Sequence, residues 1–231
     1  MTALEFKNAR LRRKWTQEEL ARKLRLSQAY VALMESGRRR VPVSLARKVV
    51  RVMNMSATTL PLPKTAAPSE PKELAAQLGA LGYPGFSHLR GSRKRNPVEV
   101  LVSALTQDDL ESRITEALPW LMLRSYEMSN ATRQWLLDQA RLRNLTNRLG
   151  FVVSLAKEVA ARSAGTTSTQ YNALVTLENE LRASRLDRED TLCQKFLSDS
   201  EREWLRQARP QAAVDWHLLT DWRPEFLNYA A

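Results

Sequence analysis

Residues 16–37 read TQEELARKLRLSQAYVALMESG, and this stretch decides the fold of the N-terminal part of the chain. Thr16, followed three residues later by Glu19, makes the capping-box pattern that begins a helix. Ser27 can cap a second helix, and Gly37 stands where the residue after a helix commonly lies. The stretch therefore predicts two short helices joined by a tight turn.

Apolar residues at helical spacing give each of these two helices an inward face. Leu20, Ala21 and Leu24 share that face on the first helix, where the small Ala21 allows close approach of the second. Val31 and Met34 point back from the second helix. The open face of the second helix is left to Gln28, Ala29, Ala32 and Leu33.

Three short pieces at fixed spacing carry a family resemblance: TQEELA at 16–21, LSQ at 26–28 and ESG at 35–37. Leu45 and Val49 follow at the positions of a fourth helix. On these residues, the segment from about residue 3 to 60 resembles the Cro/phage-repressor (XRE) helix-turn-helix family. The resemblance implies a five-helix, lambda-repressor-like DNA-binding domain.

One position departs from the family pattern. The family usually has Gly in the turn between the two helices, where this chain has Arg25. That position often needs a positive φ, which is uncommon for Arg. We therefore expect a slightly different turn, in which Arg25 either tolerates strain or contacts a phosphate.

Side chains on the open face of the second helix are candidates for reading bases. A Gln at the place of Gln28 can bond adenine N6 and N7 together, and apolar side chains there can touch thymine methyl groups. Gln17 begins the preceding helix, where its side chain and backbone N–H can meet a phosphate. The other candidates for DNA contacts, each also explicable as an ordinary surface residue, are Arg10, Ser27, Tyr30, Arg38, Arg39 and Arg40.

The distribution of charge supports a nucleic-acid partner. The chain has 36 Lys and Arg against 25 Asp and Glu, a net charge of +11. Residues 1–60 hold 14 basic and 4 acidic residues, which gives +10, so residues 61–231, with 22 and 21, hold only +1. A basic excess confined to one domain is typical of proteins that displace phosphate counterions. No long apolar run or lipidation motif favours a membrane surface instead.

Composition limits the other possibilities. The single cysteine, Cys193, excludes an internal disulfide and a cysteine-based zinc cluster, and is expected to be a small apolar residue, buried or half-buried. No segment has the pattern of a signal peptide or a membrane span, so we expect a cytoplasmic protein.

The chain is predicted to be all-α, with a helix-turn-helix domain at 1–60, a linker at 61–71 and a larger helical partner-binding or dimerisation domain at 72–231. Four prolines between residues 60 and 71 preclude a regular helix there and favour an extended segment. In the first helix, Leu4 and Leu11 are expected to point inward. No segment alternates long enough to predict a strand. The remaining predicted helices are 3–15, 44–53, 56–60, 73–81, 97–105, 108–126 with a kink or break before Pro119, 131–164, 171–184 and 198–209.

Nothing in the sequence singles out a catalytic or metal site, so no enzymatic activity, metal or cofactor is expected. His88 and His217 have no spaced companions. Gly91-Ser92 is not followed by the alternating carboxylates of a nucleotidyltransferase, since Asp108 and Asp109 are adjacent. The basic loop at 90–95 is open to two interpretations: it binds a phosphate, RNA or an acidic partner, or it is simply solvated.

The C-terminal segment is rich in aromatic residues, which form core more often than interface but can anchor a partner. Trp216, Trp222 and Phe226 are the predicted partner-binding residues. The pattern as a whole predicts a sequence-specific transcriptional repressor that acts as a homodimer. From architecture alone, we expect an antitoxin that neutralises a toxin encoded in its operon and represses its own promoter. The alternative is a regulator whose helical domain binds a small-molecule effector.

Overall fold

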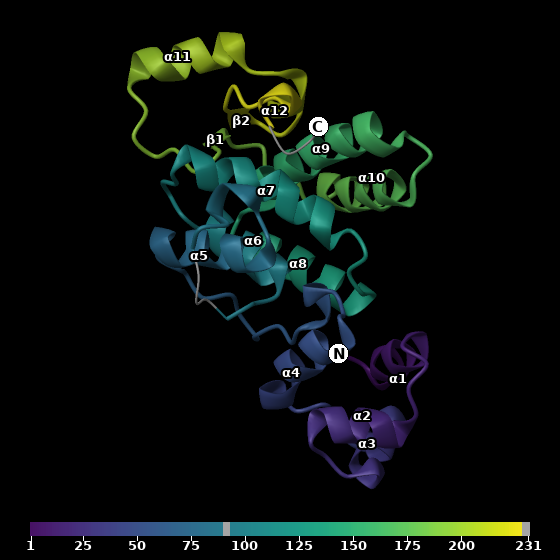
Figure 1. Cartoon of the computed structure of the whole chain (residues 1–231). Coiled ribbons are helices and arrows are strands. Elements are labelled where there is room, and N and C mark those ends of the chain that lie inside the picture. Colours follow the sequence, from purple (N-terminus) through teal and green to yellow (C-terminus); the bar gives the residue numbers. More distant parts are fainter. Residues whose placement is uncertain (90–92, 228–231) are drawn as a thin grey trace. The chain divides into compact units, whose positions relative to one another are not determined.

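The computed structural model describes residues 1–89 and 93–227, which form two compact units, Met1–Leu62 and Pro63–Ala231 (Figure 1). Among these residues the fold is mostly helical, with 63% of the chain in helices and 3% in strands, so the all-α prediction is confirmed. Part of the basic loop at 90–95, and Tyr229 of the aromatic tail, lie outside the described residues.

The first unit contains four α-helices and one 3₁₀ turn. Thr16 and Glu19 form the predicted capping box: the Thr16 hydroxyl accepts from Glu19 N at 3.1 Å, and the Glu19 carboxylate accepts from Thr16 N at 2.7 Å. Ser27 caps the next helix by accepting from Tyr30 N. The predicted fifth helix is only the 3₁₀ turn. The elements are α1 Ala3–Arg12, α2 Gln17–Leu24, α3 Gln28–Glu35, α4 Val43–Met53 and η1 Ala57–Thr59.

The core of the first unit is built by one face from each α-helix. Its buried members are Phe6, Ala9, Leu20, Ala21, Leu24, Val31, Met34, Val49 and Met53. The prediction that Leu4 and Leu11 point inward was wrong, because they are 66% and 51% exposed. Thr2 caps α1, and the rotation of the helix that follows places Phe6 and Ala9 inward instead. Phe6 is also the larger apolar side chain, so its burial removes more surface from water.

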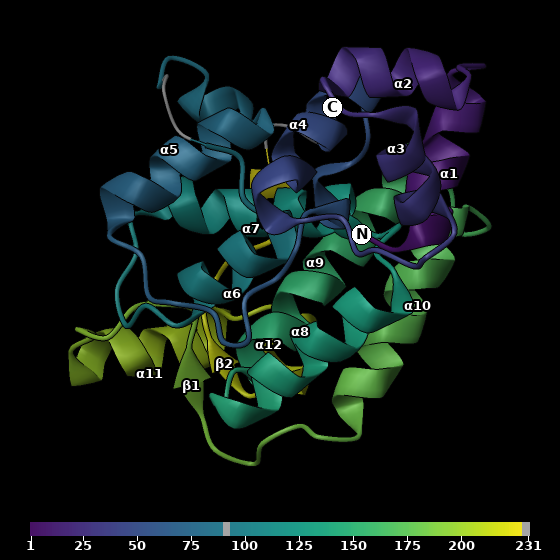
Figure 2. The same ribbon diagram turned by 90° about the horizontal axis from the view of Figure 1, so that it is seen from below.

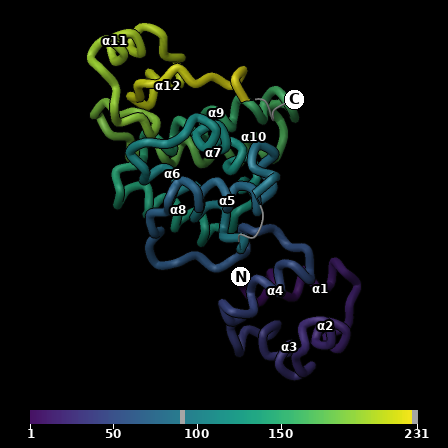
Figure 3. The backbone as a smooth tube through the Cα atoms, turned by 60° about the vertical axis from the view of Figure 1, so that its left-hand side comes forward, coloured from purple at the N-terminus to yellow at the C-terminus, as the bar shows by residue number. Residues whose placement is uncertain are grey.

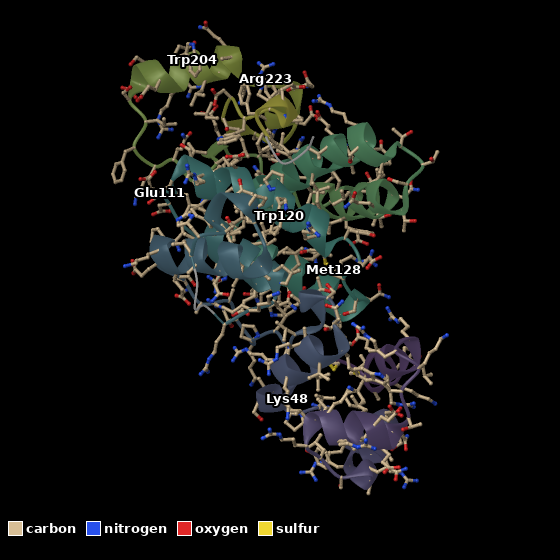
Figure 4. All side chains as sticks on the ribbon, viewed as in Figure 1. Lys48, Glu111, Trp120, Met128, Trp204 and Arg223 are labelled. Atoms are coloured by element: carbon tan, nitrogen blue, oxygen red, sulfur yellow. The ribbon has the colours of Figure 1, made fainter. Side chains whose placement is uncertain are left out.

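The turn between α2 and α3 is left-handed at Arg25, with φ 56° and ψ 50°. It thus keeps the conformation that a glycine would adopt, at a cost of about 1 kcal/mol for a residue with a Cβ. Leu26 N donates to Ala21 O, which closes the end of α2. From α4, the Lys48 ammonium group donates to Leu24 O (Figure 4). The end of α2 is therefore held by both local and distant donors.

The second unit is a larger helical assembly centred on α6, α7 and α9, and Figure 2 shows α8, α9 and α10 packed alongside one another. Every residue of α6 is buried. Its elements are α5 Pro71–Leu81, η2 Pro84–Phe86, α6 Pro97–Leu105, α7 Ser112–Ser125, α8 Asn130–Leu142, α9 Thr146–Ala164, α10 Thr169–Arg182, β1 Asp190–Thr191, α11 Asp199–Ala208, α12 Gln211–Asp215, β2 Leu218–Leu219 and η3 Pro224–Phe226.

The single helix predicted over 131–164 is in fact two helices, α8 and α9. Asn144 adopts a left-handed conformation with φ 57°, and Leu145 N donates to Ala140 O at 2.8 Å to close the turn. Asn is one of the few residues that visit this conformation readily. Because the helix ends there, Leu142 is 76% exposed and lies outside the core. Conversely, α7 continues through Pro119 without a break.

The C-terminal segment folds back on the helical core through Trp216. This side chain is fully buried, and its Nε1 donates to the Ser154 hydroxyl at 2.8 Å. Its ring lies against Gly150, at which an added Cβ would come within 2.4 Å of the ring. Just beyond Trp216, β2 pairs in parallel with β1. The sequence pattern did not predict these two-residue strands.

The proline-rich segment at 63–70 belongs to the second unit and packs against its helix α8. Trp135 Nε1 donates to Pro63 O at 2.8 Å, and Ala66 N donates to Gln139 Oε1 at 3.2 Å. Ala66 is only 2% exposed. Side chains from α8 thus satisfy main-chain groups that an extended segment cannot pair internally. Among the described residues, no helix is both long and apolar enough to cross a membrane.

Candidate nucleic-acid interface

The α2–turn–α3 segment, whose backbone path is drawn in Figure 3, has one face of α3 exposed to solvent. Val31 and Met34 are buried beneath α3, which fixes its rotation. The opposite face carries the four predicted base-reading side chains together. Gln28 and Ala29 are exposed, Leu33 is 38% exposed and Ala32 is half-buried. An α-helix that presents short side chains in this way has the dimensions to enter a major groove.

A buried ion pair fixes α3 to the two helices before it. The Arg10 guanidinium on α1 donates to both oxygens of Glu35 on α3, at 2.6 and 2.9 Å, and also to Trp15 O at 2.6 Å. Gln17, the first residue of α2, donates through Nε2 to Glu35 Oε2 at 2.9 Å. The side chains of Arg10 and Glu35 are 10% and 4% exposed. The Arg10–Glu35–Gln17 network therefore sets the relative placement of α1, α2 and α3.

The balance of burial and hydrogen bonding keeps Glu35 charged. Burial alone would raise the pKa of Glu35, but the bonds from Arg10 and Gln17 and the Arg10 charge outweigh it, so the pKa lies below its ordinary value. The bond to Glu35 in turn raises the pKa of Arg10.

This network changes the assignment of two predicted DNA contacts. Arg10 is turned into the domain and its donors are taken by Glu35 and Trp15, so we remove it from the proposed contact surface. Gln17 is half-buried with its Nε2 engaged, which leaves its backbone N–H for a phosphate. Glu35, which the sequence did not single out, is the residue that positions both of them.

The loop after α3 carries three exposed arginines, Arg38, Arg39 and Arg40. Arg39 N donates to Leu33 O at 3.0 Å, so the loop folds back over the end of α3. The Arg39 guanidinium lies over the ring of Tyr30, 4.6 Å from its centroid. This stacking places one cation beside the open face of α3.

A shallow groove of about 500 Å³ lies between the N-terminal ends of α3 and α4. Neither helix has an acidic residue in its first turn. Helix N-termini carry partial positive charge and unpaired N–H groups that favour anions. The residues that line the groove are Leu26, Ser27, Tyr30, Pro42, Ser44 and Leu45.

The second unit contains a polar cavity of about 290 Å³ near β1. Its charged walls pair with one another: Arg148 bonds Asp190 at 2.9 Å and Lys195 bonds Asp108 at 2.9 Å. Nearby, burial raises the pKa of the Cys193 thiol to about 12, so the thiol is not a reactive nucleophile. Within 1–89 and 93–227, no cluster of three His, Cys, Asp or Glu could hold a metal ion.

The predicted partner-binding aromatics do not form one surface. Trp216 is fully buried in the core, so its assignment to an interface was wrong. Trp222 is half-buried and Phe226 is 49% exposed, with their rings 6.4 Å apart. The most exposed aromatic residues described are instead Phe196 and Trp204, at 83% and 56%. Trp204 precedes the buried Leu205 on α11 and lies about 100° around the helix from it, whereas Phe196 lies in the loop before α11, where helical periodicity gives no signal.

Comparison with known proteins agrees with this geometry. Residues 6–60, which include most of α1 and all of α2 to α4, match the family described as Helix-turn-helix. No curated protein and no solved structure matches the chain. Residues 6–60 thus form a helix-turn-helix domain of the XRE family, and this domain supports a role for the chain as a DNA-binding transcription regulator.

Proposed function

We propose that the chain is a sequence-specific repressor that binds a near-palindromic operator as a dimer. The observation that carries this proposal is the open face of α3, where Gln28, Ala29, Ala32 and Leu33 lie together over a buried ion pair. One such helix contacts only a few base pairs, so specificity requires two copies. Their half-sites are expected about 34 Å, or one helical turn, apart.

The charges around α3 support binding of DNA against this open face. The groove between the starts of α3 and α4 offers N–H groups and Ser44 to a phosphate. Arg39 and Arg40 flank α3 as exposed cations. Contacts of this kind position the protein on the duplex, whereas Gln28 reads its sequence.

Substitution of a base-reading residue and of a phosphate-contacting residue should have different effects. Gln28→Ala should cost about 1–3 kcal/mol on the cognate operator and relax the preference at one base pair, because an adenine loses its paired hydrogen bonds. Arg40→Ala should weaken operator and random DNA alike and make the salt dependence shallower. Fluorescence anisotropy on both duplexes over a range of salt concentrations measures both effects.

Gln134→Ala is the matched control, since Gln134 is an exposed glutamine on α8 in the second unit, and it should leave both affinities unchanged. If Gln28→Ala weakened random DNA as much as operator DNA, Gln28 would not read a base.

We further propose that the second unit binds a toxin encoded in the same operon, which makes the chain an autoregulating antitoxin. This unit has its own large core, and its net charge of only +1 does not favour a contact with DNA. The Trp222–Phe226 pair is the revised candidate surface, since Phe226 is exposed. The effector alternative has less support, because four of the charged residues around the cavity near β1 already pair as Arg148–Asp190 and Lys195–Asp108.

Co-expression tests this partner. The neighbouring gene should be harmful alone and harmless together with this chain, and Phe226→Ser should reduce co-purification of the two proteins because it removes exposed apolar area. Leu142→Ser, which changes an exposed apolar residue on α8, should not. An innocuous neighbouring gene would remove the antitoxin proposal and leave the DNA-binding proposal intact.

A further inference from the structure

The two units differ in how readily a second copy can approach them. Residues 1–62 carry 14 basic and 4 acidic residues, a net charge of +10, whereas residues 63–231 carry 22 and 21, a net charge of +1. Two free DNA-binding units therefore repel each other in solution, and two second units do not. If the chain dimerises before it meets DNA, the second unit is the better place for the contact.

Within the second unit, α11 and the loop before it present the most exposed aromatic surface described. Phe196 is 83% exposed and Trp204 is 56% exposed. Leu205 is the only buried residue of α11, which lies at the edge of the unit, where Figure 4 labels Trp204. An exposed Trp on an otherwise polar helix is a common anchor of protein interfaces.

The sequence of α11 suits pairing with itself. Trp204 lies near the middle of Asp199–Ala208, and its neighbours one turn away are Ser200, Glu201, Gln207 and Ala208. In an antiparallel pair with a two-fold axis through Trp204, a residue a given number of positions before Trp204 in one copy faces the residue the same number of positions after Trp204 in the other copy. Ser200 then faces Ala208 of the second copy, and Glu201 faces Gln207. Small residues meet small ones, and no like charges oppose each other along this stripe, where the Glu201 carboxylate already accepts from Ser198 and the Gln207 amide already donates to Glu203 within each copy.

We propose that α11 is the dimerisation helix of the chain, pairing antiparallel with α11 of a second copy and placing the two Trp204 rings at the two-fold axis. This inference rests on the proposed dimeric function, but its contact lies wholly in the second unit. The small side chains at 200 and 208 let the two helices pack closely on either side of the axis, and the pair of Trp rings fills the centre of the contact.

A cross-linking experiment on the full chain tests the two-fold axis. A residue on the axis is the one position that meets its own copy, so Trp204→Cys should form a disulfide-linked dimer under mild oxidant. The native Cys193 is buried and should contribute none. Leu142→Cys, at a more exposed position on α8, is the matched control and should stay monomeric on a non-reducing gel.

Sedimentation equilibrium gives the quantitative test. Trp204→Glu should raise the dimer dissociation constant by about tenfold or more, because it places two like charges at the axis. Leu142→Glu, with the same change of charge, should leave that constant unchanged. Circular dichroism melts of all the variants should match the wild type, since both positions are exposed.

The proposal is overturned if the wild type sediments as a monomer at the concentrations used, or if Trp204→Glu dimerises like the wild type. It is also overturned if Leu142→Cys cross-links as readily as Trp204→Cys. Binding to a single half-site, measured separately, should be the same for Trp204→Glu and wild type. Loss of dimerisation with retained half-site binding supports the inference, whereas absent half-site binding in the wild type sinks the DNA-binding proposal itself.

Discussion

Trp216→Ala should destabilise the second unit by about 3–5 kcal/mol, the usual cost of removing a large buried aromatic side chain. Trp216 is fully buried and bonds Ser154 through Nε1, and the Arg182 guanidinium lies over its ring at 5.4 Å from the centroid. Its removal leaves a cavity beneath the C-terminal segment, and the Ser154 hydroxyl loses one donor while it keeps its bonds to Gly150 O and Glu178. Urea unfolding followed by circular dichroism measures the loss, and Trp204→Ala, at an exposed position, should change little.

Gly150→Ala tests the same contact from the other side. The added Cβ would lie 2.4 to 2.5 Å from three atoms of the Trp216 ring, so the ring must move and its bond to Ser154 must weaken. Overpacking of this kind costs about 1–3 kcal/mol. Wild-type stability for Gly150→Ala would mean that Trp216 does not pack on α9 as described.

Glu35→Ala should destabilise the DNA-binding unit by about 3 kcal/mol or more, because it leaves the Arg10 guanidinium buried without its carboxylate. A domain of about 60 residues has little stability in reserve, so operator binding should be lost at moderate temperature. Thermal unfolding and anisotropy on the full chain measure the two effects. Glu18→Ala, which removes an exposed carboxylate from α2, is the control and should behave as wild type.

The same network predicts a pH dependence. The pKa of Glu35 in the folded chain lies below its ordinary value of 4.5, so the unfolded state takes up this proton first. The stabilisation is fully present above about pH 4.5 and is lost as the pH falls through the folded pKa. Below that pH, wild type and Glu35→Ala should therefore converge in stability. Equal sensitivity of both proteins to acid would contradict the assigned role of Glu35.

Local signals in the sequence were enough to predict most helix starts. Thr16 and Ser27 cap the helices expected of them, and Ser198 caps the helix predicted from residue 198, because a cap needs only a hydroxyl and nearby backbone N–H groups. The helix at 97–105 was also predicted with its observed bounds, since Pro is favoured at the first position of a helix.

Features that depend on distant residues were not predictable from the sequence. Arg10 and Glu35 are 25 residues apart and have no periodic relation, so Arg10 was mistaken for a DNA contact. Trp216 was assigned to an interface. Its packing against Gly150 of α9 depends on the folded helix, and no local pattern in the sequence reveals it. The break at Asn144 was missed because neither Gly nor Pro marks it.

The most direct test of the central claim is a selection of duplexes from random DNA with the purified full chain, followed by footprinting of the enriched sequence. The α3 face predicts enrichment of a near-palindromic motif, with protected half-sites about one helical turn apart and affinity that falls steeply with salt. Enrichment of no sequence over random DNA, or protection of one asymmetric site by a single copy, would contradict it.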